Sequence, residues 1–129
     1  MKTTDIGALG ENIASDFLKK HKYKIIDRNL HRSHNEIDIV AFDKATETLV
    51  FVEVKARCVD TDLYSSFGTP ATAVTKAKQI RTISAAKEYL SKTNKTKYLQ
   101  IRFDVIEVYL QKEIYKILKI NHIENAFGA

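Results

Sequence analysis

The sequence predicts an α/β domain in which helices flank a mixed five-stranded sheet. Several short stretches alternate apolar and polar residues, which is typical of strands, and two others carry apolar residues at helical spacing. These stretches follow one another as helix, three strands, helix and two strands, or α-β-β-β-α-β-β. That order is typical of a sheet with helices packed on its faces. The 129 residues are expected to form one domain, 1–129.

The first helix is predicted over residues 5–21, with Thr3 or Thr4 as its cap. Glu11 lies at the edge of the apolar stripe of this helix. Its side chain could form a surface salt bridge, or it could reach along the sheet toward the hairpin. The first strand is predicted over residues 23–30. The apolar stripe consists of Ile6, Leu9, Ile13 and Phe17, widened by Ala14 and Leu18.

A β-hairpin is predicted next, over residues 36–57. Two alternating runs, 36–42 and 49–57, are rich in β-branched and aromatic residues, and a short polar segment joins them. We expect a register that is symmetrical about the middle of that segment. One face of the hairpin then carries Ile37, Ile39, Ala41, Val50, Val52 and Val54, and the other carries Val40, Phe42, Leu49 and Phe51 together with the charged residues.

The same register places Asp38 opposite Glu53, and Glu36 opposite Lys55. Directly opposed residues have Cβ atoms roughly 5 Å apart, and two carboxylates at that separation repel by roughly 3 kcal/mol at an effective dielectric of about 20. Lys55 or a bound cation would offset this repulsion. Carboxylate oxygens suit Mg²⁺ or Mn²⁺. The alternative is a set of solvated charges on a half-exposed hairpin.

The second helix is predicted to start at Thr69, with Pro70 at its first position, and to end near Leu90. Strands follow over residues 98–110 and 113–120, and the tail 121–129 is predicted to form a short helical turn. Ile123 and Phe127 would pack this tail onto the body. The buried face of the second helix is expected to hold Ala73, Val74, Ala77, Ile80, Ile83 and Ala86.

Charge and composition describe a globular protein with a basic segment. The net charge is +5, and the hydrophobic content is 44%. Residues 76–102 carry eight Lys or Arg and one acid, Glu88. Such a segment beside an acidic cluster is typical of a phosphate-binding site that uses a metal, although solvated helix faces are often basic too. No apolar run is long enough for a membrane span, and the single cysteine, Cys58, favours the cytoplasm.

Several short motifs, taken in order, resemble the YraN-like family of small bacterial proteins. That family in turn resembles the restriction-endonuclease-like nucleases of the PD-(D/E)xK superfamily, and among them the archaeal Holliday-junction resolvases. Asn35 stands where the family usually has glycine, and Ile37 stands at the proline of the superfamily name. The motifs are Gly10-Glu11, Arg28-Asn29, Glu36-Ile37-Asp38, Phe51-Val52-Glu53-Val54-Lys55, Lys78-Gln79, Arg102-Phe103-Asp104-Val105 and Asn125-Ala126-Phe127.

The resemblance implies a restriction-endonuclease-like fold and a site that uses Mg²⁺ or Mn²⁺. Asp38 and Glu53 would be the metal carboxylates and Lys55 the motif lysine. Glu11 would be the helix-borne acid that some members add to the metal site, and the backbone carbonyl of Val54 a further ligand. Contacts to the phosphates of the nucleic acid would come from Arg57, Lys76, Lys78, Gln79 and Arg81.

Three functional hypotheses follow. The first is a metal-dependent endonuclease that acts on branched or otherwise structured DNA. The second is a nucleic-acid-binding protein that has the fold without turnover. The third is an adaptor whose acids only form ion pairs with Lys55 and Arg57. A homodimer is an expectation carried over from the junction resolvases, which cut two strands. Fold alone does not decide among the three.

Overall fold

The computed structural model describes residues 3–32, 35–60, 74–93 and 100–128. The element order is the predicted one. No helix in these ranges is both long and apolar enough to cross a membrane. The elements are α1 (Thr3–Lys20), β1 (Tyr23–Arg32), β2 (Asn35–Asp43), β3 (Thr48–Val59), α2 (Lys76–Lys92), β4 (Ile101–Gln111) and β5 (Ile117–Phe127).

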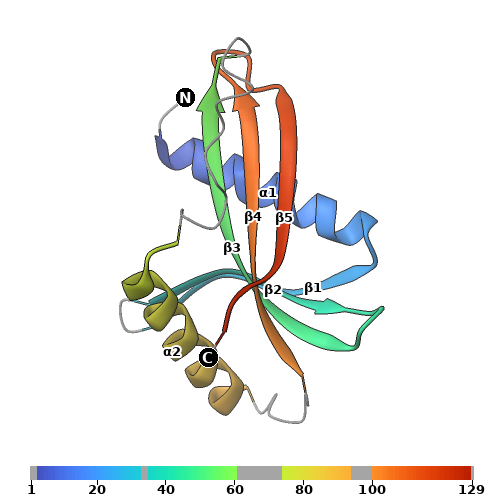
Figure 1. Ribbon diagram of the computed structural model, residues 1–129, viewed down its shortest axis with the longest axis vertical. Coiled ribbons are helices and arrows are strands. Elements are labelled where there is room, and N and C mark those ends of the chain that lie inside the picture. The colour runs from blue at the N-terminus through green and yellow to red at the C-terminus, as the bar shows by residue number, and fades with distance from the viewer. Residues whose placement is uncertain (1–2, 33–34, 61–73, 94–99, 129) are drawn as a thin grey trace.

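The five strands form one mixed sheet in the order β1-β2-β3-β4-β5. The β3–β4 pair is parallel, and the other three pairs are antiparallel. A parallel pair needs a crossover connection, and α2 lies in the segment that connects β3 to β4. The helices pack against opposite faces of the sheet, with α1 across one face and α2 against the other (Figure 1).

Each helix covers its own hydrophobic cluster. Ala14 and Leu18 of α1 are fully buried against Val50, Val52 and other residues of the sheet. The predicted stripe of α1 is therefore confirmed. The second cluster joins α2 to the other face, where its residues are Ile37, Val40, Leu49, Phe51, Ala85, Ala86, Tyr89 and Phe103. Ile37 was expected beside Ile39 in the first cluster, but β2 leaves its ladder with β3 at Ile39, and Ile37 packs in the second cluster.

The prediction for the second helix was partly wrong. Residues 69–73, including the predicted start at Pro70, lie outside the described ranges, and α2 begins at Lys76 with Thr75 as its N-cap. Ile80 is 58% exposed, although it was expected to be buried. Ala77 is exposed as well. Ala86 is buried as predicted, and Thr82, Ala85 and Tyr89 complete the buried side of α2. The Thr82 hydroxyl donates to the Lys78 carbonyl at 3.0 Å, so its hydrogen bond is made within the helix.

The last strand was also predicted too early and too short. β5 runs from Ile117 to Phe127, so the tail pairs with β4 and does not form the helical turn that was expected. Phe127 does pack onto the body, because its ring stacks on Phe103 with centroids 5.3 Å apart. A register shift interrupts the β4–β5 pairing, and Asn125 has a φ of 53° there. Because of this irregularity, apolar and polar residues do not alternate regularly along β5, and the sequence pattern does not predict the strand.

Candidate functional site

The predicted hairpin register is confirmed near the turn and changes at the acids. Val40 pairs with Phe51, as expected, but the ladder between β2 and β3 ends at Ile39 and Val52. Asp38 therefore has no backbone partner on β3. Its Oδ2 instead accepts a hydrogen bond of 2.7 Å from the backbone N–H of Val54. The side chain of Asp38 is thus fixed to β3 one residue beyond Glu53, whereas the expected pairing of Glu36 with Lys55 is absent from the ladder.

The two acids share one electrostatic environment. Burial is the largest cause that raises the pKa of Asp38, to about 7, and the charge of Glu53 is the second. The hydrogen bond from Val54 opposes the shift, Glu11 adds to it, and Lys78 lowers the pKa again. A raised pKa in a buried acid beside another acid is typical of functional sites. The structure therefore brings Asp38 and Glu53 close enough to interact, although they are not the directly opposed pair that the sequence predicted.

Glu53 is the most deeply buried member of this group, at 5% exposure. Two lysines approach the same oxygen, with Nζ of Lys55 at 3.5 Å and Nζ of Lys78 at 3.7 Å from Oε1. The other oxygen, Oε2, is buried and has no hydrogen-bond partner among the described residues. A buried carboxylate oxygen without a partner is costly, so Oε2 is available to a cation.

The donor set fits a hard divalent cation that is held by few protein ligands. Mg²⁺ is usually bound through one or two carboxylates together with water and phosphate oxygens, and Asp38 and Glu53 supply two such carboxylates. The described residues contain no group of three or more His, Cys, Asp or Glu that is close enough to hold a metal. Any remaining ligands would thus be water, substrate oxygens or a backbone carbonyl such as that of Val54, whose role stays a prediction.

Glu11 lies at the edge of the site rather than in a three-acid group. It is 4.0 Å from Nη2 of Arg28. With its amide nitrogen turned toward α1, the side chain of Asn29 donates to both carboxylate oxygens of Glu11. Asn29 has a φ of 54°, which asparagine tolerates better than most residues. The Arg28-Asn29 motif therefore holds Glu11 in place, a role that the sequence did not reveal.

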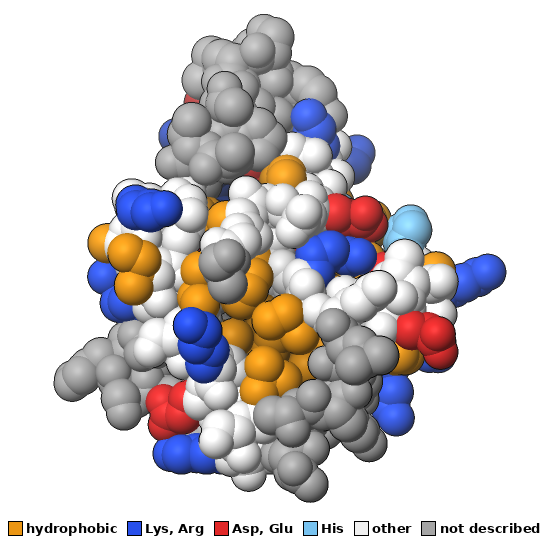
Figure 2. Space-filling model, turned by 60° about the horizontal axis from the view of Figure 1, so that its bottom comes forward, with side chains coloured by type: hydrophobic (Ala, Val, Ile, Leu, Met, Phe, Trp, Pro, Cys, Tyr) orange, Lys and Arg blue, Asp and Glu red, His pale blue; other side chains and the backbone are white. Residues whose placement is uncertain are grey.

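The predicted phosphate-binding residues separate into two groups. Lys78 lies in the site, whereas the side chain of Gln79 donates to the Val74 carbonyl at 3.2 Å and does not contact the acids. Lys76 and Arg81 are exposed on α2. Arg57 is 47% exposed and forms an ion pair with Glu107 on β4. With the lower end of the molecule turned forward, an apolar area is exposed, and both basic and acidic side chains lie around it (Figure 2).

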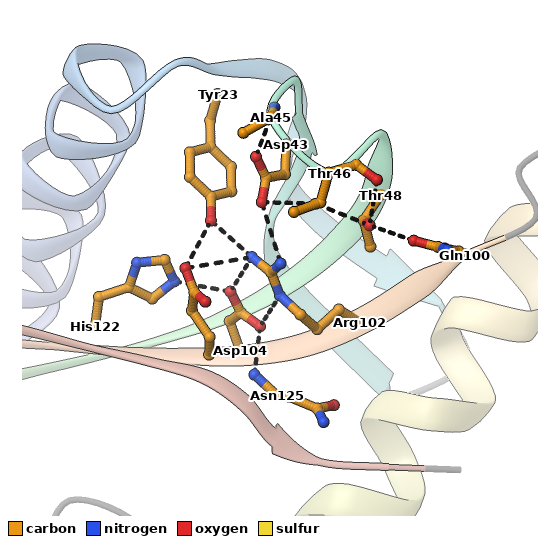
Figure 3. A network of polar contacts seen from close by, with 11 residues as sticks. Tyr23, Asp43, Ala45, Thr46, Thr48, Gln100, Arg102, Asp104, His122 and Asn125 are labelled. Carbon is orange, nitrogen blue, oxygen red and sulfur yellow. Dashed lines mark hydrogen bonds and ion pairs between the residues drawn. The ribbon is translucent and has the colours of Figure 1, made fainter.

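A second polar cluster lies on β4 and β5, where Asp104 is fully buried (Figure 3). Arg102 binds Asp104 through two nitrogens, at 2.8 and 2.9 Å, and His122 lies 2.7 Å from Oδ2 of Asp104. Arg102 also donates to Asp43 at 3.1 Å and to the Tyr23 hydroxyl at 2.6 Å. These groups satisfy one another, which is typical of a structural network. The sequence predicted no role for them.

The comparisons with known proteins agree on one family. Residues 10–108 match the family described as "Uncharacterised protein family UPF0102". A UPF0102 protein of Caldanaerobacter subterraneus is 43% identical over 122 residues, which cover 95% of this chain and 93% of the relative. A UPF0102 protein of Alkaliphilus oremlandii is 43% identical over 95% of this chain and 97% of the relative. A UPF0102 protein of Caldicellulosiruptor saccharolyticus is 41% identical over 98% of this chain and 100% of the relative.

Proposed function

This chain belongs to the YraN-like family UPF0102, and we propose that it is a metal-dependent endonuclease that hydrolyses phosphodiester bonds in branched or structured DNA. The observation that carries the proposal is the buried pair of Asp38 and Glu53, in which one oxygen of Glu53 has no hydrogen-bond partner among the described residues. An acid pair of this kind is unfavourable without a cation. Lys55 beside it completes the residue types that metal-dependent phosphodiester cleavage needs.

Each side chain of the site has a distinct part in the proposed reaction. Mg²⁺ or Mn²⁺, when bound by Asp38 and Glu53, would polarise the phosphoryl oxygens and lower the pKa of a bound water. The N–H of Val54 fixes one oxygen of Asp38 and so sets the orientation of this carboxylate. Lys55 would orient the attacking hydroxide or balance the charge that develops on the phosphate. Lys78 would hold the phosphate from the side of α2.

The exposed basic residues are proposed to grip the nucleic acid away from the reaction centre. Arg57, Lys76 and Arg81 are exposed, and each can neutralise a phosphate. Binding through such contacts weakens steeply as salt increases, because counterions are released from the nucleic acid. Gln79 is not part of this proposal, since its side chain donates to the carbonyl of Val74, which lies just before the N-cap of the same helix.

One observation favours a second candidate, a nucleic-acid-binding protein without turnover. Lys55 and Lys78 already place two positive charges beside Glu53, and the described residues offer no third acid or histidine to complete a metal cage. Such a site is neutralised without a metal. The two candidates differ in what the acids do: in the first they bind the metal, and in the second their removal leaves nucleic-acid affinity intact or raises it.

A cleavage panel tests the proposal. Duplex, flap, four-way junction and single-stranded DNA, and RNA, are incubated with Mg²⁺ or Mn²⁺ and with EDTA. We expect cleavage that EDTA abolishes and that Asp38→Asn, Glu53→Gln and Lys55→Ala each reduce by about 100-fold or more. Asp16→Asn is the matched control, since Asp16 is exposed on α1. The proposal fails if EDTA or the first two variants leave cleavage unchanged. Salt-sensitive binding without cleavage by the wild type favours the second candidate.

A further inference from the structure

Glu107 is a buried acid that the proposed reaction does not use. It lies on β4 and is 1% exposed. Its Oε1 accepts a hydrogen bond of 2.9 Å from the Tyr109 hydroxyl, and its Oε2 is 3.5 Å from Nε of Arg57. Burying a charged carboxylate costs free energy unless partners compensate for it. Glu107 is thus held at one oxygen and has its other oxygen directed at an arginine.

The parallel register places this group on the same face as the acid pair. Glu53 pairs with Val105, Lys55 pairs with Glu107, and Arg57 pairs with Tyr109. Alternate residues of a strand point to the same face, so Glu53, Lys55 and Arg57 follow one another along β3. Arg57 lies four residues beyond Glu53, or about 13 Å along the strand. This distance is too large for both residues to serve one phosphate.

The side chain of Arg57 is held by Glu107 at Nε and is partly exposed to solvent. Its side chain is 47% exposed, although its partner Glu107 is almost fully buried. Within the described part of the chain, Arg57 has no ion pair other than the one through Nε, which leaves its terminal amino groups for a ligand. Guanidinium groups bind phosphates through two parallel N–H donors, and fixing the group beforehand lowers the entropic cost of binding.

We propose that Arg57 forms a second phosphate subsite, which binds a phosphodiester of the nucleic-acid strand a few nucleotides from the bond that is cut, and that Glu107 is its positioning residue. Tyr109 fixes Glu107, and Glu107 fixes the guanidinium. This inference rests on the proposed function. The strand would then run along β3 from the acid pair toward Arg57.

A binding experiment without cleavage tests the inference. Affinity for fluorescent single-stranded and duplex DNA is measured by anisotropy in EDTA at several salt concentrations. Arg57→Ala should weaken binding about fivefold and reduce the slope of log affinity against log salt by about one. Lys24→Ala is the matched control, because it removes one exposed positive charge from β1 and should change affinity less than twofold.

Glu107→Gln separates positioning from charge. The variant keeps an acceptor for Tyr109 but loses the charge that holds Arg57, so we expect binding about threefold weaker. The same substitution in the Arg57→Ala background should have no further effect. Tyr109→Phe is a second variant, which removes only the hydroxyl and should act in the same direction and again only when Arg57 is present. Thermal unfolding checks that each variant is folded.

Several outcomes would overturn the inference, and they differ from failure of the proposed function. If Glu107→Gln tightens binding, Glu107 only neutralises Arg57. If it weakens binding equally with and without Arg57, its role is structural. If Arg57→Ala binds like the wild type, the subsite does not exist, although the acid pair remains open to test by cleavage. If the wild type does not bind nucleic acid at all, the proposed function fails together with the inference.

Discussion

Asp38 is a proposed metal ligand, and its pKa is strongly shifted by its surroundings. Burial and the neighbouring Glu53 raise its pKa to about 7, so that Asp38 keeps a proton to a higher pH than an ordinary carboxyl group does. A carboxylate that binds a metal must first lose this proton. The same group therefore costs stability when it is ionised without a cation and is available as a ligand when a cation is present.

This pKa predicts how metal binding depends on pH. Below pH 7 the proton competes with the metal for Asp38, so the affinity for Mn²⁺ should fall about tenfold per pH unit, and above pH 7 it should level off. Calorimetric titration of Mn²⁺ at pH 6, 7 and 8 measures this directly. Asp38→Asn, which cannot titrate, is the control and should bind more weakly with little pH dependence. An affinity for the wild type that is the same at pH 6 and 8 would contradict the assignment.

The sequence predicts which residues meet in the site but not how they are held. Strand alternation and the hairpin register were enough to place Asp38 near Glu53. They could not show that the ladder ends at Ile39 and that the Val54 N–H binds the Asp38 side chain, because alternation assumes an unbroken ladder. Lys78 comes from a helix, and its distance from Glu53 depends on tertiary packing that no local pattern encodes.

At the scale of the elements, α1 lies very close to β3 at Gly10. A Cβ built on Gly10 would lie 2.7 Å from the Cβ of Ala56, which is closer than two such carbons can approach. Glycine therefore allows the helix to lie directly on the strand that carries Glu53 and Lys55. Glu11, the next residue of α1, is brought to the edge of the site by the same contact.

Gly10→Ala should therefore destabilise the protein, although alanine normally favours a helix. We expect a loss of about 1–3 kcal/mol in the free energy of unfolding, since the backbones of α1 and β3 must separate. Gly7→Ala is a matched control, because the added methyl group would have only the backbone of its own helix within 4 Å, and it should stabilise by about 0.5–1 kcal/mol. Urea denaturation of both variants provides the measurement. Equal stability of Gly10→Ala and the wild type would show that the close contact is not needed.

The elements also show where prediction from the sequence ends. The apolar stripe of α1 has a clear helical period, and its buried face was predicted correctly. The Thr69-Pro70 signal was not the start of α2, which is capped by Thr75. The polar residues of β5, including Asn121 and His122, lack a clean alternation, because this edge strand is only partly buried and its pairing is interrupted. A strand of this kind forms because it pairs with β4, and its own residue pattern does not predict it.

At the scale of the whole molecule, the Asp104 network connects strands that are distant in the sequence. Tyr23 of β1, Asp43 of β2, and Arg102 and Asp104 of β4 meet His122 of β5 in one buried cluster (Figure 3). The Arg102-Phe103-Asp104-Val105 motif could be recognised in the sequence. Its partners could not, because they lie on three other strands and only the completed sheet brings them together.

The network gives stability a defined dependence on pH. Burial alone would raise the pKa of Asp104, but hydrogen bonds from His122, Arg102 and the Asn125 backbone outweigh it, so the pKa lies below 3.8. An acid with a lowered pKa stabilises the folded state above its unfolded pKa, and this contribution is lost as the pH falls through the folded value. The contribution of Asp104 is therefore complete near pH 7 and declines below about pH 4.

Asp104→Asn should consequently destabilise the protein at pH 7 by about 3 kcal/mol, because it leaves the buried Arg102 with only part of its counter-charge. The difference from the wild type should begin to shrink below about pH 4, where Asp104 of the unfolded chain begins to bind a proton. Urea midpoints at pH 7, where the contribution is complete, and at pH 3.5, where its loss has begun, measure both effects. Asp60→Asn is the matched control, since Asp60 is exposed and its ion pair with Lys112 is long, at 4.0 Å. This substitution should change stability by less than about 0.5 kcal/mol. A stability difference for Asp104→Asn that is absent at pH 7, or equally large at both pH values, would contradict the role of this buried charge as the centre that joins the four strands.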